Sequence, residues 1–255
     1  MARLQGKVAV VTGAALGMGF AISQRFAEEG AKVIMGDINE EKLHEAVKKI
    51  QDAGGDVTGL VANVTKQVDV DKMLEAAVKH YGKLDVLVNN AGIMDNFKTA
   101  ESLDDKLYDL VMDVNVRGPM MLIRGAIPLM KKAGKGAILN IASVAGLNGS
   151  RGGYIYTASK HALVGMTKNI GYVYATEGIR CNAIAPGGVA TSIGESETMK
   201  SPDEFGMGRA GLGFGLNPRY GEAVEIANAA VFLCSDEASF VSGDVLVVDG
   251  GWTAY

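Results

Sequence analysis

The feature that most restricts the fold of this 255-residue chain is a regular alternation of short apolar runs with longer helical patterns. Several of the runs are β-branched and apolar throughout, as is typical of strands that are buried on both faces. Such an alternation predicts right-handed crossovers and a parallel sheet covered by helices on both sides. We expect strands at Lys7–Val11, Lys32–Met35, Asp56–Ala62, Val86–Asn89, Ala137–Ile141, Arg180–Ala185 and Asp244–Val248. We expect helices at Gly17–Glu29, Glu40–Ala53, Lys66–Tyr81, Ser102–Ala133, Tyr156–Thr176 and Glu222–Cys234.

No Pro-rich or Ser-rich linker divides the chain, so we expect a single α/β domain over residues 1–255. A segment near 190–218 differs from the rest because it is rich in glycine, at Gly206, Gly208, Gly211, Gly213 and Gly215. Glycine makes a rigid helix costly and a mobile segment easy. We therefore expect a mobile loop that closes over a bound substrate.

The bulk composition excludes several classes of protein. The net charge is −4 and no dense basic run occurs, so we expect no nucleic-acid partner. No apolar stretch reaches the roughly 18 residues of a membrane span, and the first residues lack an apolar signal segment. Cys181 and Cys234 fit no metal spacing and are expected to be core thiols. We expect a cytoplasmic protein without a bound metal.

A glycine turn follows the first predicted strand. Thr12 is followed by G-x-x-x-G-x-G, with glycines at Gly13, Gly17 and Gly19, and then by a helix. Glycines allow a tight turn and the close approach of a pyrophosphate to the helix N-terminus, where free N–H groups stabilise an anion. The turn therefore predicts a dinucleotide site.

Asp37 ends the next predicted strand, and an acidic side chain there can accept hydrogen bonds from a ribose diol and would repel a 2′-phosphate. The glycine turn and the stretch from Gly36 to Glu41 contain no Lys or Arg. We expect NAD(H) to be preferred over NADP(H).

Tyr156 and Lys160 lie four residues apart in a predicted helix, which places them on one face, one turn apart. A positive charge beside a phenol favours the phenolate and lowers the pKa of the tyrosine. The pair predicts a proton carrier, which fits hydride transfer at a dinucleotide site.

The motifs together resemble those of the short-chain dehydrogenase/reductase family. They run in order over nearly the whole chain: the glycine turn, Asn89-Asn90-Ala91-Gly92, Asn115, Ser143, Tyr156 with Lys160, and Pro186-Gly187. The resemblance implies a Rossmann fold, a doubly wound seven-stranded parallel sheet in the order 3-2-1-4-5-6-7. It also implies a nicotinamide cofactor across the carboxyl ends of the strands.

The resemblance also implies a role for each matching residue. Tyr156 would be the acid and base, Ser143 would hold the substrate oxygen, and Lys160 would bind the nicotinamide ribose and lower the pKa of Tyr156. Asn115 would anchor a water that links Lys160 to solvent. Asn90 and Thr191 would contact the cofactor near its ribose and carboxamide, and Asn63 and Val64 would flank the adenine. The expected cofactor contacts are Gly13, Leu16, Gly17, Met18, Gly19, Asp37, Ile38, Asn63, Val64, Asn90, Ala91, Gly92, Tyr156, Lys160, Pro186, Gly187, Val189 and Thr191.

The loops on the substrate side are mostly apolar, which favours an uncharged ketone or secondary alcohol. We expect the substrate pocket to use Met94, Asn96, Val144, Leu147, Tyr154, Gly188 and the loop, with Met199 and Met207 as further candidates. Arg151 is expected to be solvated. The two long helices at 102–133 and 156–176 and the tail at 248–255 resemble the subunit contacts of tetrameric relatives, so we expect a homotetramer.

Two alternative functions remain open at this point. Some stretches resemble 3-oxoacyl-acyl-carrier-protein reductases, which dock an acidic carrier on basic residues beside two helices. At the matching positions this chain has Gly134 and Glu177, although Lys131, Lys132 and Lys135 lie nearby. The other alternative is a non-catalytic dinucleotide-binding regulator, because a fold alone does not determine a function.

Overall fold

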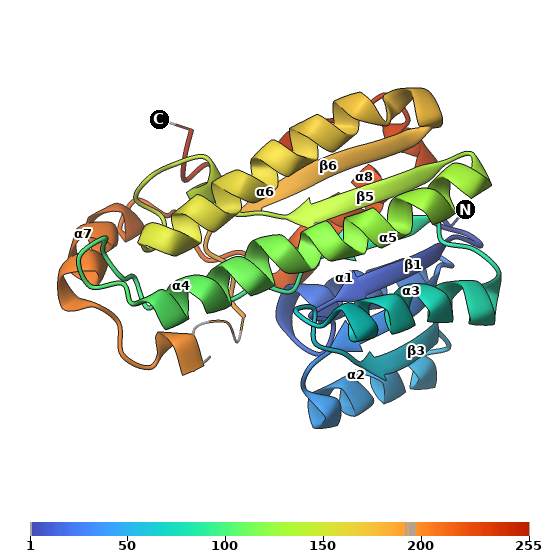
Figure 1. The fold of residues 1–255 in the computed structure, drawn as a ribbon, viewed down its shortest axis with the longest axis horizontal. Coiled ribbons are helices and arrows are strands. Elements are labelled where there is room, and N and C mark those ends of the chain that lie inside the picture. Colours follow the sequence, from blue (N-terminus) through green and yellow to red (C-terminus); the bar gives the residue numbers. More distant parts are fainter. Residues whose placement is uncertain (1, 192, 194–196, 255) are drawn as a thin grey trace.

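Seven parallel strands form one twisted sheet in the computed structural model, which describes residues 2–191, 193 and 197–254 (Figure 1). The strand order is β3-β2-β1-β4-β5-β6-β7, as predicted. The strands are β1 (Val8–Thr12), β2 (Lys32–Asp37), β3 (Asp56–Val61), β4 (Val86–Asn89), β5 (Gly136–Ile141), β6 (Ile179–Pro186) and β7 (Val245–Val248). Each strand lies within two residues of its predicted bounds, and the Rossmann fold is confirmed.

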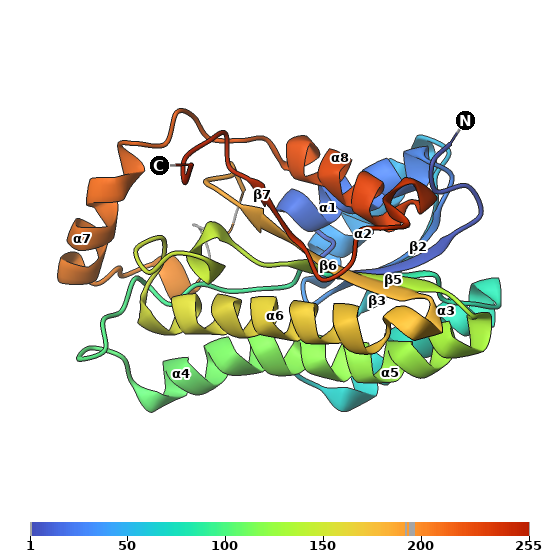
Figure 2. The same cartoon turned by 90° about the horizontal axis from the view of Figure 1, so that it is seen from above.

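The two faces of the sheet carry separate apolar cores. Successive side chains of a strand point to opposite faces. Accordingly, Ala9 and Val11 of β1 pack with α1, α2 and α8, whereas Val8 and Val10 pack with α3 and α5. Figure 2 shows the layers, with α1 and α8 above the sheet and α5 and α6 below it. Strands buried from both sides must be apolar throughout, which explains the pattern in the sequence.

The helices are α1 (Gly17–Glu28), α2 (Glu40–Asp52), α3 (Gln67–Tyr81), α4 (Asp105–Met112), α5 (Gly118–Ala133), α6 (Tyr154–Val173), α7 (Glu204–Phe214) and α8 (Ala223–Cys234). One predicted helix, 102–133, is wrong in detail. It begins only at Asp105, because Asp104 accepts a hydrogen bond from the Leu107 N–H at 2.9 Å and caps α4. It is also interrupted by a π-helical turn over Asp113–Arg117. Within the described residues, no helix is both long and apolar enough to cross a membrane.

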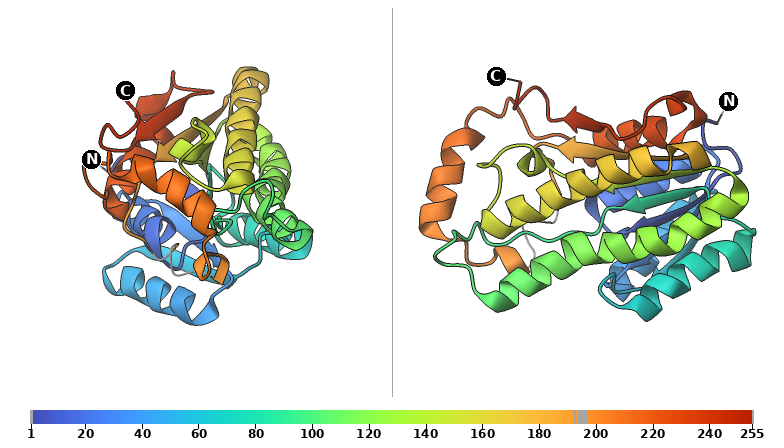
Figure 3. Two further views of the ribbon diagram at one scale, coloured as in Figure 1. Left: turned by 90° about the vertical axis from the view of Figure 1, so that its left-hand side faces the viewer. Right: turned by 45° about the horizontal axis from the view of Figure 1, so that its top comes forward.

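The glycine-rich segment was expected to be a loop, but it contains the helix α7. Asp203 caps this helix by accepting a hydrogen bond from the Gly206 N–H at 2.8 Å. A side chain at Gly206 would collide with the carbonyl of Phe97, so this glycine permits a close contact between α7 and the loop after β4. Figure 3 shows α7 beyond the carboxyl ends of the strands. Positions 192 and 194–196 of the expected loop lie outside the described residues, and its mobility stays a prediction.

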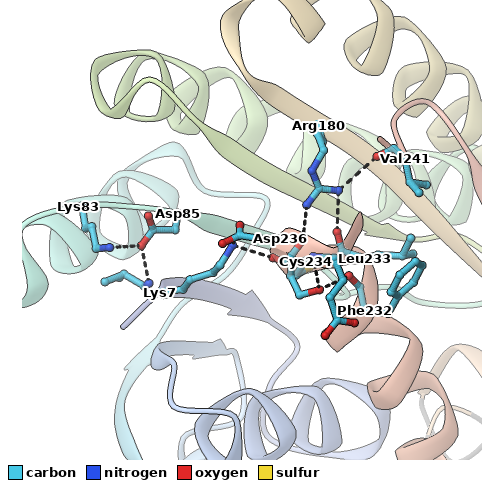
Figure 4. A network of polar contacts seen from close by, with 12 residues as sticks. Lys7, Lys83, Asp85, Arg180, Phe232, Leu233, Cys234, Asp236 and Val241 are labelled. Atoms are coloured by element: carbon cyan, nitrogen blue, oxygen red, sulfur yellow. Dashed lines mark hydrogen bonds and ion pairs between the residues drawn. The ribbon is translucent and has the colours of Figure 1, made fainter. Parts of the chain in front are cut away.

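A polar network fixes the opposite end of the sheet (Figure 4). Lys7 donates to the carbonyl of Cys234 at 3.3 Å and pairs with Asp236 at 2.6 Å. Arg180 donates to the carbonyls of Leu233 at 2.9 Å and Ser235 at 3.0 Å. Two cations therefore cap the C-terminus of α8, where the helix dipole favours positive charge. This network joins β1, β6 and α8. The two cysteines, Cys181 and Cys234, are free, buried thiols as expected.

Candidate active site

The expected proton-transfer residues meet where β5 ends and α6 begins. Ser143 and Tyr156 line a cavity of about 520 Å³ beyond the carboxyl ends of the strands. The Lys160 ammonium lies over the ring of Tyr156, with Nζ 5.6 Å from the ring centre. It donates a hydrogen bond to the carbonyl of Ile141 at 2.9 Å. The helical spacing thus places the ammonium next to the phenol ring, which lines the cavity.

Burial dominates the protonation of this pair. It raises the pKa of Tyr156 to about 12, while a hydrogen bond with Ser143 lowers it and the charge of Asp95 raises it. Burial lowers the pKa of Lys160 to about 8. In this structure the ammonium faces the aromatic ring and bonds the Ile141 carbonyl. Lys160 is not among the causes of this shift, so the predicted lowering of the Tyr156 pKa by Lys160 stays a prediction.

Asn115 lies in the π-helical turn and is 1% exposed. Its Oδ1 accepts a hydrogen bond from the Ile93 N–H at 2.9 Å, and its Nδ2 donates to the Ile93 carbonyl at 2.9 Å. Nδ2 also donates to Ser159 Oγ at 3.0 Å. The side chain therefore fixes the loop after β4 against α6. Its predicted role in anchoring a water stays a prediction, and short π-helical turns are common at functional sites.

The glycine turn has the geometry that a pyrophosphate site needs. Gly13 and Gly17 adopt φ values of +61° and +54°, in the left-handed region that favours glycine. A side chain at Gly19 would collide with the Gly13 carbonyl. Asn90 was expected to contact the cofactor ribose, but its Nδ2 donates to the carbonyls of Thr12 at 2.9 Å and Gly13 at 3.0 Å. In this structure Asn90 braces the turn.

A second cavity, of about 390 Å³, lies beside the turn. Asp37 lines it and accepts hydrogen bonds from the Ala15 N–H and the Asn39 N–H, both at 2.9 Å. No Lys or Arg is among the residues that line this cavity in the described part of the chain. Seven expected cofactor contacts line it together: Gly13, Asp37, Ile38, Asn63, Val64, Ala91 and Gly92.

The other expected cofactor contacts divide into two groups. Met18, Pro186, Gly187, Val189 and Thr191 line the 520 Å³ cavity with Tyr156. Five residues line neither cavity: Leu16, Gly17, Gly19, Asn90 and Lys160. Leu16 directly precedes α1 as its N-cap and is 45% exposed. The left-handed glycines, the turn closed by Gly19 and the acid at position 37 fit a nicotinamide dinucleotide, whose adenosine half the smaller cavity would hold.

The substrate side follows the prediction only in part. Met94, Val144, Gly188, Met199 and Met207 line the 520 Å³ cavity. Three expected pocket residues lie outside it: Asn96, Leu147 and Tyr154. Leu147 is 40% exposed and Tyr154 is 56% exposed, because the first turn of α6 presents Tyr154 to solvent. Asn96 adopts a left-handed φ of 55°, and its carbonyl accepts a hydrogen bond from the Asp203 N–H at 2.8 Å.

An aromatic wall of this cavity was missed by the sequence analysis. Trp252 is 5% exposed and donates through Nε1 to the Gly213 carbonyl at 2.8 Å. Its ring lies 5.9 Å from that of Phe214, whose ring is 5.8 Å from that of Phe97. Arg151 was expected to be solvated, but it lines the cavity and its guanidinium stacks 4.5 Å from the centre of the Trp252 ring. Trp252 lines this cavity within the chain, and the expected subunit contact of the tail stays a prediction.

Comparison with known proteins agrees with this geometry. The profile of a family described as enoyl-(acyl carrier protein) reductase matches residues 13–253. The 3beta-hydroxysteroid dehydrogenase 2 of Eggerthella lenta is 44% identical over 253 residues, covering 99% of this chain and 96% of that protein. A 3-oxoacyl-(acyl-carrier-protein) reductase of Thermotoga maritima is 40% identical, with 98% of both chains covered. The crystal structure of levodione reductase matches with a TM-score of 0.89 and 34% identity, covering 98% of this chain and 99% of that one.

These matches span nearly the whole chain. The chain therefore belongs to the short-chain dehydrogenase/reductase family and is an oxidoreductase of that family.

Proposed function

We propose that the protein is an NAD(H)-dependent dehydrogenase that interconverts an uncharged, alicyclic secondary alcohol and its ketone. The observation that carries this proposal is the position of Tyr156 and Ser143 in an apolar cavity. Gly13, Gly92 and Asp37 line the neighbouring cavity, which is suited to the adenosine half of the cofactor.

The proton and the hydride leave the alcohol by different routes. A nicotinamide cofactor held by the glycine turn and the cavity beside it would supply the hydride acceptor for the carbinol carbon, or the hydride donor for the ketone carbon. Tyr156 takes the hydroxyl proton during oxidation and gives it back during reduction. Ser143 donates to the same oxygen and fixes its position. General acid–base catalysis of this kind contributes roughly 10²–10⁴-fold to the rate.

The direction of the pKa shift at Tyr156 gives this reaction a defined pH dependence. A phenol with a pKa of about 12 is protonated near neutral pH, so it is ready to protonate a ketone oxygen. Oxidation needs the phenolate and is expected to become faster as the pH rises towards that value. Reduction is expected to be lost over the same range, because its acid is then deprotonated.

The preference for NAD(H) follows from Asp37. Its carboxylate lines the 390 Å³ cavity, and no cation in the described lining would compensate the charge of a 2′-phosphate. Electrostatic repulsion would therefore weaken the binding of NADP(H), whereas the same oxygens can accept hydrogen bonds from a ribose diol.

The shape and polarity of the cavity support a cyclic apolar substrate. Its volume of about 520 Å³ lies within the range of small-molecule sites, and three aromatic side chains form one wall: Phe97, Phe214 and Trp252. No Asp or Glu lines it in the described part of the chain. The relative from Eggerthella lenta bears the name of a hydroxysteroid dehydrogenase, so a 3β-hydroxysteroid is the first polycyclic alcohol to test.

A carrier-protein substrate has less support. The lysines near the expected docking positions, Lys131 and Lys132, lie in the last turn of α5, which precedes β5. They therefore lie at the amino end of the strands, opposite the catalytic cavity. Lys131 also pairs with Glu177 at 3.1 Å, which leaves it less available to an acidic partner.

Steady-state kinetics would test the proposal. We expect the protein to oxidise cyclohexanol and a 3β-hydroxysteroid with NAD⁺. With NADP⁺ in place of NAD⁺, kcat/KM for these alcohols should be at least tenfold lower. The kcat/KM for reduction of an acyl-thioester ketone with NADH should also be at least tenfold lower. Tyr156→Phe should abolish turnover while NADH binding, followed by fluorescence titration, stays nearly unchanged. Retention of a tenth of the normal turnover would exclude Tyr156 as the proton carrier. If the wild-type protein turned over none of these combinations of substrate and cofactor, the alternative of a non-catalytic dinucleotide-binding regulator would be favoured.

A further inference from the structure

Asp95 is a buried acid next to the catalytic helix that no motif predicted. Its side chain is 0% exposed. Oδ2 accepts a hydrogen bond from the backbone N–H of Tyr156 at 2.9 Å. Oδ1 is buried, and no hydrogen bond of good geometry reaches it from the described residues, although the backbone N–H groups of Ile155 and Phe97 lie near the carboxylate. A buried acceptor without a partner costs roughly 1–3 kcal/mol, and more when it is charged, so this position calls for an explanation.

Capping of α6 does not by itself explain an aspartate here. Asn and Ser cap helices as well as Asp does, and neither would bury a charge. The chain does use an asparagine as a cap at Asn39, which accepts from the Lys42 N–H at 3.0 Å. The negative charge of Asp95 is therefore the property that distinguishes it from a simple cap.

The backbone around Asp95 is shaped to hold the carboxylate in one place. Asn96 and Phe97 follow it with φ values of 55° and 53°, a left-handed conformation that is rare outside glycine and clusters at functional sites. Gly153 faces the carboxylate, and a side chain there would overlap both of its oxygens. The Tyr154 N–H donates to the Lys98 carbonyl at 2.8 Å. Two hydrogen bonds thus join residues 95–98 to the first turn of α6.

We propose that Asp95 is a positioning residue that fixes Tyr156 at the start of α6 through the Tyr156 backbone N–H and places a carboxylate next to the residue that exchanges the proton. This inference rests on the proposed function, in which Tyr156 exchanges a proton with the substrate. A negative charge next to the Tyr156 hydroxyl raises its pKa, whereas a cationic neighbour would lower it. The enzyme thereby keeps its acid protonated and ready for ketone reduction.

The charges around Tyr156 come from three elements. Lys160 lies one turn later on α6, Arg151 lines the same cavity from the segment before α6, and Asp95 follows β4. Of these, Asp95 raises the pKa of Tyr156 through its charge. Burial raises the pKa of Asp95 itself, whereas hydrogen bonds from the backbone N–H groups of Tyr156, Asp95, Ile155 and Phe97 lower it.

Substitution by asparagine separates charge from capping. Asp95→Asn has the same shape and can still accept from the Tyr156 N–H, but it carries no charge. The pKa of Tyr156 can be measured directly by NMR of protein labelled with ¹³C at tyrosine Cζ, with the signal assigned by Tyr156→Phe. We expect Asp95→Asn to lower it by about one unit, as is typical of removing a neighbouring charge of the same sign. The pH profiles of oxidation and reduction should both move to lower pH by the same amount.

Asp104→Asn is the matched control, because Asp104 caps α4 by the same kind of hydrogen bond and is exposed to solvent. It should leave the pKa of Tyr156 and both profiles unchanged. If Asp95→Asn does not fold, Gly153→Ala provides a second test, since the added methyl group displaces the carboxylate from the first turn of α6. It should lower kcat with little change in the KM for NAD⁺.

The outcomes are distinct. An unchanged pKa of Tyr156 in folded Asp95→Asn would overturn the proposal, as would a Gly153→Ala variant with normal kcat. The NMR measurement needs no substrate, so it tests Asp95 even if no alcohol is turned over. Absence of turnover in the wild-type protein would instead count against the proposed function alone.

Discussion

Removal of the Trp252 indole tests whether the tail of the chain forms a wall of the substrate site. Trp252→Ala deletes a ring that is 5% exposed, a hydrogen bond of 2.8 Å to Gly213 and the stacking on Arg151. These interactions hold α7 and the tail together at the mouth of the cavity. We expect the loss to appear first in the recognition of large substrates.

The ring is only 5% exposed, so a substrate buries little of it directly, and the effect comes from the packing that the ring provides to its neighbours. Replacing a buried Trp by Ala typically costs about 3–5 kcal/mol, because a cavity is left behind. We expect the cavity wall to lose its fixed position and kcat/KM for a large alcohol to fall about tenfold or more, which corresponds to about 1.4 kcal/mol. A small alcohol such as 2-propanol would not reach the ring, and its kcat/KM should change less than about threefold.

The assay compares kcat/KM for a 3β-hydroxysteroid and for 2-propanol within each variant, so that any general loss of active protein cancels. Trp252→Phe should keep most of the discrimination because it retains an aromatic face. Phe240→Ala is the control, since Phe240 is fully exposed beside the polar network at the amino end of the strands. An unchanged ratio in Trp252→Ala would show that the indole is not part of the substrate wall.

Three further predictions concern the cofactor and the buried lysine. Asp37→Asn keeps an acceptor for the Ala15 N–H but removes the charge, so the ratio of kcat/KM for NAD⁺ over NADP⁺ should fall about tenfold or more, which kinetics with both cofactors would reveal. Gly19→Ala should lower the melting temperature and weaken NADH binding in a fluorescence titration, because its methyl group overlaps the Gly13 carbonyl; normal binding would contradict the assigned turn. Lys160 has a folded pKa of about 8, below its value of 10.5 in the unfolded chain, so the unfolded state binds more protons between these values. Urea titrations should therefore show stability rising with pH over this window, and Lys160→Met should lack that rise.

The fold was predictable because every level of the sequence agrees. Apolar runs such as Val8–Thr12 are buried on both faces, which leaves a parallel sheet covered by two layers of helices as the consistent arrangement. The glycine turn and the Tyr156–Lys160 spacing are local patterns. Such patterns determine short-range geometry, and the structure places the glycine turn and the Tyr156–Lys160 pair together at the carboxyl ends of the strands.

The parts that escaped prediction depend on contacts between distant segments. Trp252 contacts Gly213 and Arg151, which lie far from it in the sequence, and nothing in its sequence neighbourhood indicates those partners. The glycines of α7 predicted a loop, because intrinsic propensity counts against a helix and the packing of Phe214 against Phe97 and Trp252 was not visible. Asp95 shows the same limit, since its partner Tyr156 is far away in the chain.

The π-helical turn over Asp113–Arg117 has a consequence for how α4 and α5 tolerate change in length. A wide turn accommodates one residue more than an α-helical turn. Deleting one residue there would restore a regular helix through both segments, and intrinsic helix stability would rise. It would also rotate the preceding helix by about 100° relative to α5, which would carry the position of Asn115 away from Ile93. The shorter chain should fold well but lose the hydrogen bonds between Asn115 and Ile93 that hold the loop after β4, so the wide turn serves the site at the expense of helical regularity.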